Sequence, residues 1–209
     1  VVLAALPGKA ALTLSRGASS AARPRLAYTV ARLIQMLERQ KAQADDPSRF
    51  RPEGDVTFTP RTLLVLDEAG MLDTPSMHRL LQLLPQGVRL LFVGDNGQLP
   101  PVGFGQVFHD LVEEGSRTIP LTQVLRQKDG SVIPLIAAQV RAGRPLVLPV
   151  WQGEPAGVFR LPTAQRQAAQ RRLRAAGDVL ALAALRATVS AINEDEASDL
   201  RTPATPLRR

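Results

Sequence analysis

The chain has 209 residues, of which 44% are hydrophobic and 22% are charged. This length allows one large domain or two small ones, and the composition is typical of a folded, soluble protein rather than a disordered chain. The chain has no cysteine, which excludes disulfides, zinc–thiolate sites and a thiol nucleophile. No apolar run reaches the roughly 18 residues that a membrane helix needs. We therefore expect a cytoplasmic protein with no membrane partner.

Positive charge is concentrated towards the two ends of the sequence. Lys and Arg number 26 against 19 Asp and Glu, which gives a net charge of +7, and 23 of the cations are arginine. Residues 1–60 carry nine cations and five acids, residues 61–140 six and eight, and residues 141–209 eleven and six. This pattern suggests a metal or phosphate site in the middle and an anionic partner such as nucleic acid. Arginine used only as a solvated surface cation is the alternative, and charge alone does not separate the two.

The N-terminal part of the chain predicts a strand and then a helix. Residues 1–6 form an apolar run closed by a Pro-Gly turn, which is typical of a buried strand. A secretory signal is the competing interpretation, but no basic segment precedes the run. Apolar residues at helical spacing predict a helix over residues 28–40, with Thr29 placed near its start. Residues 45–60 are polar and rich in proline, so they predict a loop.

Residues 62–93 are typical of a strand–helix–strand unit. Residues 62–66 are an apolar run that ends at an Asp-Glu pair, a helix is predicted from Thr74 to Leu84, and residues 89–93 are a second apolar run. Strands joined in this way are parallel. Uniformly apolar strands are typically covered by helices on both faces, so the sequence predicts an α/β fold with a mainly parallel sheet.

Further elements are predicted downstream, with a domain boundary near residue 118. They are helices over residues 104–114, 131–142, 163–176 and 188–200, a Pro- and Gly-rich loop over residues 144–162, and a short strand over residues 179–182. The only tryptophan, Trp151, lies in that loop, and a packing role is favoured over stacking on a nucleobase.

Acidic residues end the first strand of the strand–helix–strand unit. Asp67 and Glu68 follow one strand, and Gly94 and Asp95 follow the other, so all four lie at the sheet edge where ligands bind in open α/β folds. A carboxylate at the end of a buried strand is costly unless it is compensated. Mg²⁺ held together with substrate phosphates would compensate Asp67, and Glu68 could then activate a water. A solvated Asp-Glu pair is the alternative.

Five segments resemble, in the correct order, motifs of superfamily 1 helicases. Residues 63–73 (LLVLDEAGMLD) resemble the Walker B motif, residues 92–103 (FVGDNGQLPPVG) resemble motif III, and residues 125–127 (LRQ) resemble motif IV. Residues 3–11 are similar to motif Ia, and residues 29–34 to the DNA-contacting motif that follows it. The Leu-Pro-Pro-Val-Gly ending of motif III points to the RecD-like branch, which includes the exodeoxyribonuclease V alpha subunit and the helicase part of conjugative relaxases.

The resemblance implies a RecA-like P-loop NTPase fold with ATP and Mg²⁺ as cofactors. A nearly complete first motor domain would span residues 1–118, and the start of a second would span residues 119–209. Asp67 would coordinate Mg²⁺, Glu68 would activate the attacking water and Gln98 would sense the γ-phosphate. Arg126 would reach across from the second domain as an arginine finger. The residues implied at the nucleotide are Asp67, Glu68, Gly94, Asp95, Gln98 and Arg126.

Single-stranded DNA is the partner that the resemblance implies, together with other subunits of a recombination or conjugation complex. Backbone and a cation would meet phosphates, while an apolar turn would meet bases. The implied contacts are Gly8, Lys9, Thr29, Pro100, Pro101 and Val102. A helix cap is an equally good interpretation of Thr29. The two prolines are also expected to form a rigid turn, which is compatible with a DNA contact.

The sequence departs from the pattern of the family at several positions. Gly8 and Lys9 do not form a P-loop, because the positions that require Gly and Ser or Thr hold Leu3 and Ala10. No segment resembles motifs V and VI. Three further departures are Leu6-Pro7 in place of Pro-Thr in motif Ia, Ala31 in place of histidine in the next motif, and Gly70 in place of a small hydroxyl residue.

The sequence therefore favours an ATP-dependent DNA helicase of the RecD-like type, which would move 5′ to 3′ along single-stranded DNA. We expect the P-loop and the last motifs to lie outside these 209 residues, so that the chain alone binds ATP weakly and is inactive. A non-catalytic nucleic-acid-binding or scaffold subunit that retains the fold is the alternative. A superfamily 1 helicase that acts on RNA is a third hypothesis.

Overall fold

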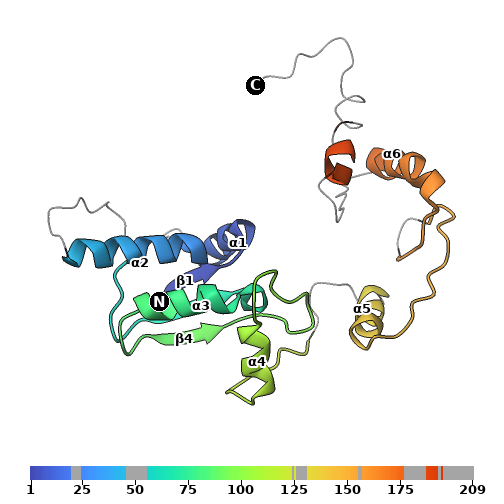
Figure 1. Cartoon of the computed structure of the whole chain (residues 1–209). Coiled ribbons are helices and arrows are strands. Elements are labelled where there is room, and N and C mark those ends of the chain that lie inside the picture. The colour runs from blue at the N-terminus through green and yellow to red at the C-terminus, as the bar shows by residue number, and fades with distance from the viewer. Residues whose placement is uncertain are drawn as a thin grey trace, which may run out of the picture. The chain divides into compact units, whose positions relative to one another are not determined.

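The computed structural model describes residues 1–19, 25–45, 56–123, 125, 131–154, 157–176, 187–192 and 194. The chain divides into two compact units, Val1–Gln123 and Val124–Arg209 (Figure 1). The first unit contains a sheet with helices packed on it, and the described part of the second is helical with long connecting loops. No helix in these described ranges is long and apolar enough to cross a bilayer.

Four parallel strands form the sheet of the first unit, in the order β2–β1–β3–β4. Ala5 pairs with Thr29 on one side and with Asp67 on the other, and Leu66 pairs with Phe92. The four strands therefore end together at one carboxyl edge. Their bounds are β1 (Val2–Ala5), β2 (Ala27–Thr29), β3 (Leu63–Asp67) and β4 (Arg89–Phe92). The predicted α/β fold with a parallel sheet is confirmed.

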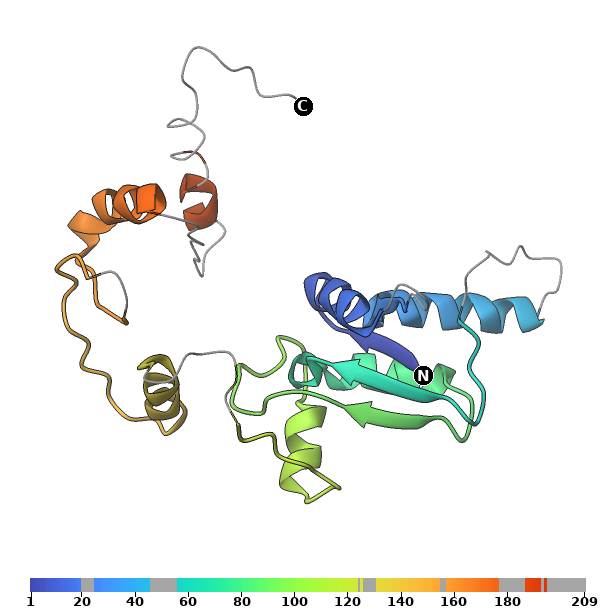
Figure 2. The ribbon, with the colours of Figure 1, turned by 180° about the vertical axis from the view of Figure 1, so that it is seen from behind.

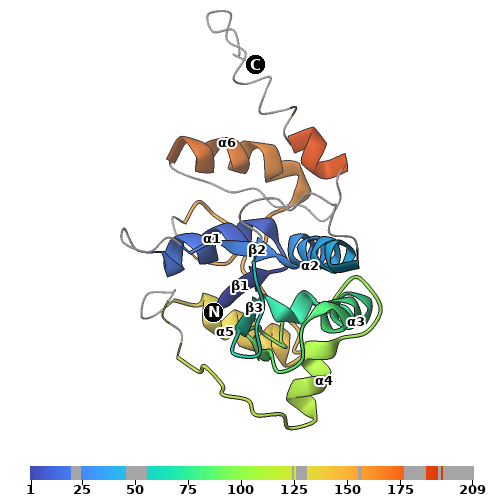
Figure 3. The ribbon, with the colours of Figure 1, turned by 90° about the vertical axis from the view of Figure 1, so that its left-hand side faces the viewer.

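Helices lie on both faces of this sheet. Helix α1 (Gly8–Ala18) packs on β1 and β2, whereas α2 (Val30–Asp45) and α3 (Thr74–Leu83) pack against each other on the opposite face (Figure 3). Right-handed crossovers explain the split. The chain moves one way across the sheet from β1 to β2, and the other way from β2 to β3 and from β3 to β4.

The hydrophobic core lies between the sheet and the pair of helices α2 and α3. The strands contribute every second residue, as expected for side chains that alternate between two faces, and α2 contributes residues at helical spacing. The buried residues of this core include Val2, Ala4, Val30, Leu33, Ile34, Leu37, Leu64, Leu66, Met77 and Leu80.

Three helices of the first unit differ from the sequence predictions. Helix α1 is not predicted, because two glycines and no acidic first turn leave it without a start signal in the sequence. Helix α4 (Val107–Glu113) begins after the predicted start at Phe104, because Gly105 has a φ of +80°, which a helix cannot include. Helix α2 extends beyond the predicted end, to Asp45.

One face of β3 and β4 is not covered by any helix in the described part of the first unit. Leu90 and Phe92 point to the core, so Leu91 lies on the opposite face, where it is 48% exposed, and Val65 on β3 is half-buried there. Figure 2 shows the two strands from this side. The prediction that helices cover both faces is wrong here, because α1 reaches only β1 and β2, and the crossover to β4 places α3 on the other face.

The second unit contains α5 (Ile133–Arg141), η2 (Thr163–Gln165) and α6 (Arg166–Ala176). Gly143, with a φ of +64°, follows α5 and ends it as predicted. Residues 187–192 are helical, in agreement with the start of the last predicted helix. The predicted strand over residues 179–182 lies outside the described residues. That this unit begins a second RecA-like domain stays a prediction.

Trp151 has a packing role in the loop that precedes α6. Its indole Nε1 donates to the carbonyl of Glu154 at 3.0 Å, and the guanidinium of Arg172 lies 5.5 Å from its ring centre. The backbone N–H of Gln152 donates to the carboxylate of Glu154 at 2.8 Å, and this bond lowers the pKa of Glu154.

Replacing a core leucine tests the placement of the core. Leu66→Ala removes a fully buried side chain from β3 and is expected to lower the free energy of unfolding by about 2–5 kcal/mol. Leu81→Ala, at a position on α3 that is 48% exposed, is the matched control and should change it by less than about 1 kcal/mol. Urea denaturation followed by circular dichroism measures both, and equal losses would contradict the assigned core.

Candidate functional site

The carboxyl edge of the sheet brings together most of the predicted site residues. Thr29 ends β2 and Asp67 ends β3, while Gly8 follows β1 and Gly94 follows β4. The strand register places these ends side by side, since Ala5 of β1 pairs with both Thr29 and Asp67. Residues from four separate segments thus share one edge, as open α/β sheets require for a ligand site.

The backbone is strained at the predicted catalytic acid. Glu68 has φ 54° and ψ 38°, which is the left-handed region, and it is the only non-glycine residue with positive φ in the described part of the chain. This conformation costs about 1–2 kcal/mol for an L-residue. The Glu68 N–H donates to Oδ1 of Asp67 at 3.0 Å, and the chain then enters the short helix η1 (Ala69–Met71). Strain of this kind concentrates at active sites.

Two hydrogen bonds extend the pairing of β3 and β4 beyond the strand ends. Val93 N–H donates to the carbonyl of Leu66 at 2.9 Å, and Ala69 N–H donates to the carbonyl of Val93 at 2.9 Å. The loop that begins with the acid pair is therefore fastened to the loop that begins with Gly94.

Glycines allow these two loops to touch. A Cβ on Gly94 would lie 3.0 Å from the nitrogen of Gly70 and 3.1 Å from the ring of Phe108. A Cβ on Gly70 would lie 3.2 Å from the carbonyl oxygen of Asp95. Side chains at either position would separate the loops, so the close contact depends on glycine.

The segment after β4 begins with a hydrogen-bonded turn. Asp95 Oδ1 accepts from Gly97 N–H at 2.9 Å, and the carbonyl of Asp95 accepts from Gln98 N–H at 3.2 Å. The side chain of Gln98 is exposed. Gln98 is thus tied through its backbone to the loop that faces the acid pair, while its amide is accessible to a ligand.

The proline-containing loop is anchored to the start of α3. Thr74 N–H donates to the carbonyl of Phe104 at 2.9 Å. Gly103 lies against Asp73, and Gly105 lies against Thr74, so closely that a Cβ at either glycine would overlap the neighbouring side chain. The loop therefore returns to α3 through a contact that only glycine permits.

Apolar side chains project from this anchored loop into solvent. Pro100 and Val102 are exposed and Pro101 is half-buried, and these are residues that the sequence predicts to contact DNA. Leu99 and Phe104 are 86% and 82% exposed and were not predicted. Phe104 lies between Gly103 and Gly105, the two glycines that contact α3. This position of a large apolar residue was the sequence signal that could have identified it.

The predicted DNA contacts Gly8 and Thr29 also lie together. A Cβ on Gly8 would be 4.0 Å from Cγ2 of Thr29. Thr29 caps α2, because its Oγ1 accepts from Arg32 N–H at 3.1 Å, whereas α1 begins after Pro7 without a side-chain cap. Lys9 is exposed in the first turn of α1. An uncapped helix start with a lysine is favourable for an anion.

Two further residues, Arg126 and His109, differ in how far the structure describes them. Arg126, the predicted arginine finger, lies outside the described residues. His109 on α4 is buried, with Nδ1 unpartnered within the described ranges, and its Cε1 would lie 3.9 Å from a Cβ on Gly70. An isolated histidine in a helix carries no sequence signal for a functional role.

The chemistry of the edge is compatible with Mg²⁺ that arrives with a nucleotide. The described residues contain no group of three or more His, Cys, Asp or Glu that could hold a metal ion alone. Mg²⁺ in phosphate-transfer sites is typically held by one or two carboxylates, with phosphates and waters as the remaining ligands. The half-buried Asp67 at the end of β3 fits that requirement.

A parallel sheet flanked by helices, with an acid pair at its carboxyl edge beside a glycine-containing turn, is the arrangement of RecA-like domains. A family profile described as an AAA domain matches residues 1–148, and the chain belongs to this AAA domain family.

The chain is also similar to RecD-type helicases. It is 42% identical over 81 residues to the ATP-dependent RecD2 DNA helicase of Deinococcus radiodurans. This match covers 39% of this chain and 11% of the relative. It is 37% identical over 99 residues to the RecBCD enzyme subunit RecD of Mycobacterium tuberculosis. This match covers 46% of this chain and 17% of the relative. The matched segments thus span less than a fifth of these relatives. The resemblance to the RecD-like branch is confirmed.

The glycine contact between the two loops can be tested by substitution. Gly94→Ala is expected to lower the free energy of unfolding by about 1–3 kcal/mol, because its Cβ would press on Gly70 and Phe108. Gly17→Ala in α1, where nothing lies within 4 Å of the new Cβ, should instead raise it by about 0.5–1 kcal/mol. Thermal unfolding of the two variants distinguishes the cases, and a stabilised Gly94→Ala would contradict the close contact.

The strain at Glu68 predicts a gain in stability when a glycine replaces it. Glu68→Gly is expected to raise the free energy of unfolding by about 0.5–1 kcal/mol, because glycine adopts positive φ without a steric penalty. Glu68→Gln keeps the Cβ and should leave stability unchanged. Urea denaturation compares them, and the same stability in all three proteins would show that the left-handed backbone is unstrained.

Proposed function

We propose that the protein containing this chain is an ATP-dependent DNA helicase or translocase of the RecD type, which couples ATP hydrolysis to 5′ to 3′ movement along single-stranded DNA. One observation carries the proposal. Asp67 and a strained Glu68 lie at the carboxyl edge of a parallel sheet and are fastened by backbone hydrogen bonds to the loop of Gly94 and Asp95. The similarity to helicases of the RecD type supports it.

The residues of the edge divide the chemistry between them. Asp67 would hold Mg²⁺, which supplies positive charge to the phosphates when it is bound. Glu68 would take a proton from the attacking water on its carboxylate. Gln98 would sense the γ-phosphate, and its backbone link to Asp95 connects that event to the proline-containing loop. Arg126 remains the proposed arginine finger.

The uncovered face of the sheet supports a nucleotide site that is completed by further chain. Consider a strand that pairs with the outer edge of β4 and is connected through a helix to β1. The rule that such crossovers are right-handed determines which face of the sheet that helix covers. The helix between them must cross the face on which Leu91 and Val65 lie, and this is the face that the described helices leave uncovered. A P-loop placed between such a strand and helix would lie at the carboxyl edge, beside Asp67.

The DNA would follow the same edge of the sheet. Gly8 and Lys9 at the start of α1 would bind phosphates, with Thr29 beside them. The loop of Pro100, Pro101 and Val102 would present apolar surface to the bases on a backbone fixed by α3. Because one relative is named as a subunit of the RecBCD enzyme, partner subunits of a recombination or conjugation complex are part of the proposal.

A non-catalytic nucleic-acid-binding subunit is the second candidate function. It is favoured by the residues around Gly8 and Lys9, which lack the P-loop pattern. Such a subunit would bind single-stranded DNA at the same edge without hydrolysing ATP.

Hydrolysis of ATP by the full-length gene product distinguishes the candidates. The wild-type protein should hydrolyse ATP faster when single-stranded DNA is present, and Glu68→Gln should lower that rate by about 100-fold or more while DNA binding is retained. A rate that survives the substitution would contradict the role of Glu68. DNA binding without hydrolysis in the wild type would select the non-catalytic subunit, and substrates with a 5′ or a 3′ tail would test the direction of movement.

A further inference from the structure

Two consecutive residues at the start of α3 hold the far end of the proline-containing loop. Oδ2 of Asp73 occupies the place that a Cβ on Gly103 would take. Oγ1 of Thr74 does the same at Gly105. Between these two contacts, Thr74 N–H donates to the carbonyl of Phe104 at 2.9 Å. The loop therefore touches the start of the helix at three successive residues.

Asp73 uses its two carboxylate oxygens for different contacts. Oδ1 accepts from Ser76 N–H at 2.8 Å and caps α3. A cap needs only one oxygen, and the hydroxyl of a serine caps a helix about as well as a carboxylate does. Oδ2, in contrast, lies against Gly103. Capping accounts for the first oxygen, so the contact of the second oxygen with the loop calls for a separate role.

A short, hydrogen-bonded segment joins Asp73 to the acid pair. Four residues separate Asp73 from Glu68. The carbonyl of Glu68 accepts from Met71 N–H at 3.1 Å, and the next carbonyl, of Ala69, accepts from Leu72 N–H at 3.1 Å. Leu72 is 1% exposed and belongs to the core. Because this segment is hydrogen-bonded and its end is buried, a displacement of Asp73 is passed on to Glu68.

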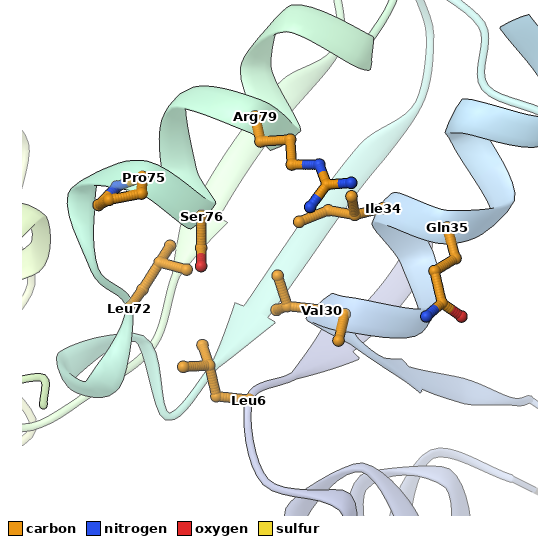
Figure 4. A pocket seen from close by; sticks show the side chains of 9 residues that line it. Leu6, Val30, Ile34, Gln35, Leu72, Pro75, Ser76 and Arg79 are labelled. Carbon is orange, nitrogen blue, oxygen red and sulfur yellow. The ribbon is translucent and has the colours of Figure 1, made fainter. Parts of the chain in front are cut away.

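The first turn of α3 borders a pocket on the side of α2. The pocket has a volume of about 390 Å³, and its walls come from the end of β1, from α2 and from the segment that leads into α3. Figure 4 shows side chains around this space, among them Leu6, Val30, Leu72, Pro75 and Ser76. Packing from α2 therefore does little to fix the first turn, and its position depends more on the contacts with the proline-containing loop.

The segment after β4, which includes the proline-containing loop, is attached at both ends to the segment that carries the acid pair. At the start, the carbonyl of Val93 accepts from Ala69 N–H at 2.9 Å. At the end, Gly103 lies against Asp73. The side chain of Val102, next to this second attachment, is fully exposed. A ligand that presses on the exposed part of the loop would therefore act on the acid-bearing segment from two sides.

We propose that Asp73 is a positioning residue, which transmits the binding of DNA at the proline-containing loop to the acid pair through the contact of its second oxygen with Gly103. This role rests on the proposed function, since it deepens the link between DNA binding and the hydrolysis of ATP. Asp73 acts through Gly103 and η1 and has no part in the chemistry itself. Loss of the contact should thus weaken the stimulation of hydrolysis by DNA and leave the DNA-independent rate unchanged.

Three variants of the full-length gene product separate this role from helix capping. Asp73→Ser keeps an oxygen that can cap α3 and removes the oxygen beside Gly103. Asp73→Asn keeps the shape of the side chain and the cap, and it is the matched control. Gly103→Ala breaks the same contact from the loop side, because its Cβ would overlap Asp73. Urea denaturation should give equal midpoints for the wild type and both Asp73 variants, because the cap is retained.

The rate of ATP hydrolysis is measured for each protein against the concentration of an oligodeoxythymidylate. In Asp73→Ser the stimulation by saturating DNA should fall about tenfold, with the DNA-independent rate and the KM for ATP unchanged. Asp73→Asn should retain the stimulation. Gly103→Ala should behave like Asp73→Ser, and the double variant should be no worse than either, because both substitutions break one contact.

Cleavage by chymotrypsin after Phe104 reports on the loop without any need for the hydrolysis of ATP. The carbonyl of Phe104 accepts from Thr74 N–H, so the peptide bond there is protected while the loop is attached to α3. Mass spectrometry of the fragments follows this bond. We expect cleavage to be about fivefold faster in Asp73→Ser and in Gly103→Ala than in the wild type, and unchanged in Asp73→Asn.

Four results would overturn the role of Asp73. Unchanged stimulation in Asp73→Ser would show that the contact does not transmit DNA binding. An equal loss in Asp73→Ser and Asp73→Asn would show that the negative charge matters instead of the contact, and a parallel fall in the DNA-independent rate would assign the effect to the chemistry. If the wild-type protein hydrolyses no ATP, the proposed function fails together with this role, and cleavage after Phe104 then shows only whether Asp73 fixes the loop. The first three results leave the proposed function standing.

Discussion

Two backbone hydrogen bonds, Val93 N–H to Leu66 and Ala69 N–H to Val93, determine how the functional edge of this protein is built. These bonds lie just beyond the ends of β3 and β4. The two segments that leave the strands therefore remain hydrogen-bonded to each other. The loops that follow cannot move independently, and the acid pair stays at a fixed place relative to the turn of Asp95. A change at one loop would therefore be transmitted to the other.

The hydrogen bonds between the two loops explain why the backbone there is strained and closely packed. Two loops tied so closely meet at Gly70 and Gly94, and the chain turns through a left-handed Glu68 before it reaches Gly70. The surrounding sheet, with α2 and α3 packed on its other face, is stable enough to hold the strained residue. The same edge carries exposed apolar residues on the loop anchored to α3. The edge thus has a rigid part, which carries the acids, and an exposed apolar part further along the loop.

The sequence was most informative where local pattern and fold agree. The strands and helix of residues 62–93 were predicted because apolar runs, Pro75 and the acid pair mark each boundary. Helix α1 was missed because Gly8 and Gly17 weaken its helical signal, and its stability comes from packing on β1 and β2. The pocket between α2 and α3 had no sequence signal at all, because its walls come from three segments that only the crossovers bring together. The strain at Glu68 is likewise a backbone property that residue type does not reveal.

The outer edge of β4 has a consequence for the behaviour of the chain in solution. Within the described residues this strand pairs only with β3, so its outer backbone groups form a template for another strand, and Leu91 adds an apolar face next to it. Arg89 is the single charged residue on the strand. On this strand, only the charge of Arg89 would oppose edge-to-edge pairing of two copies.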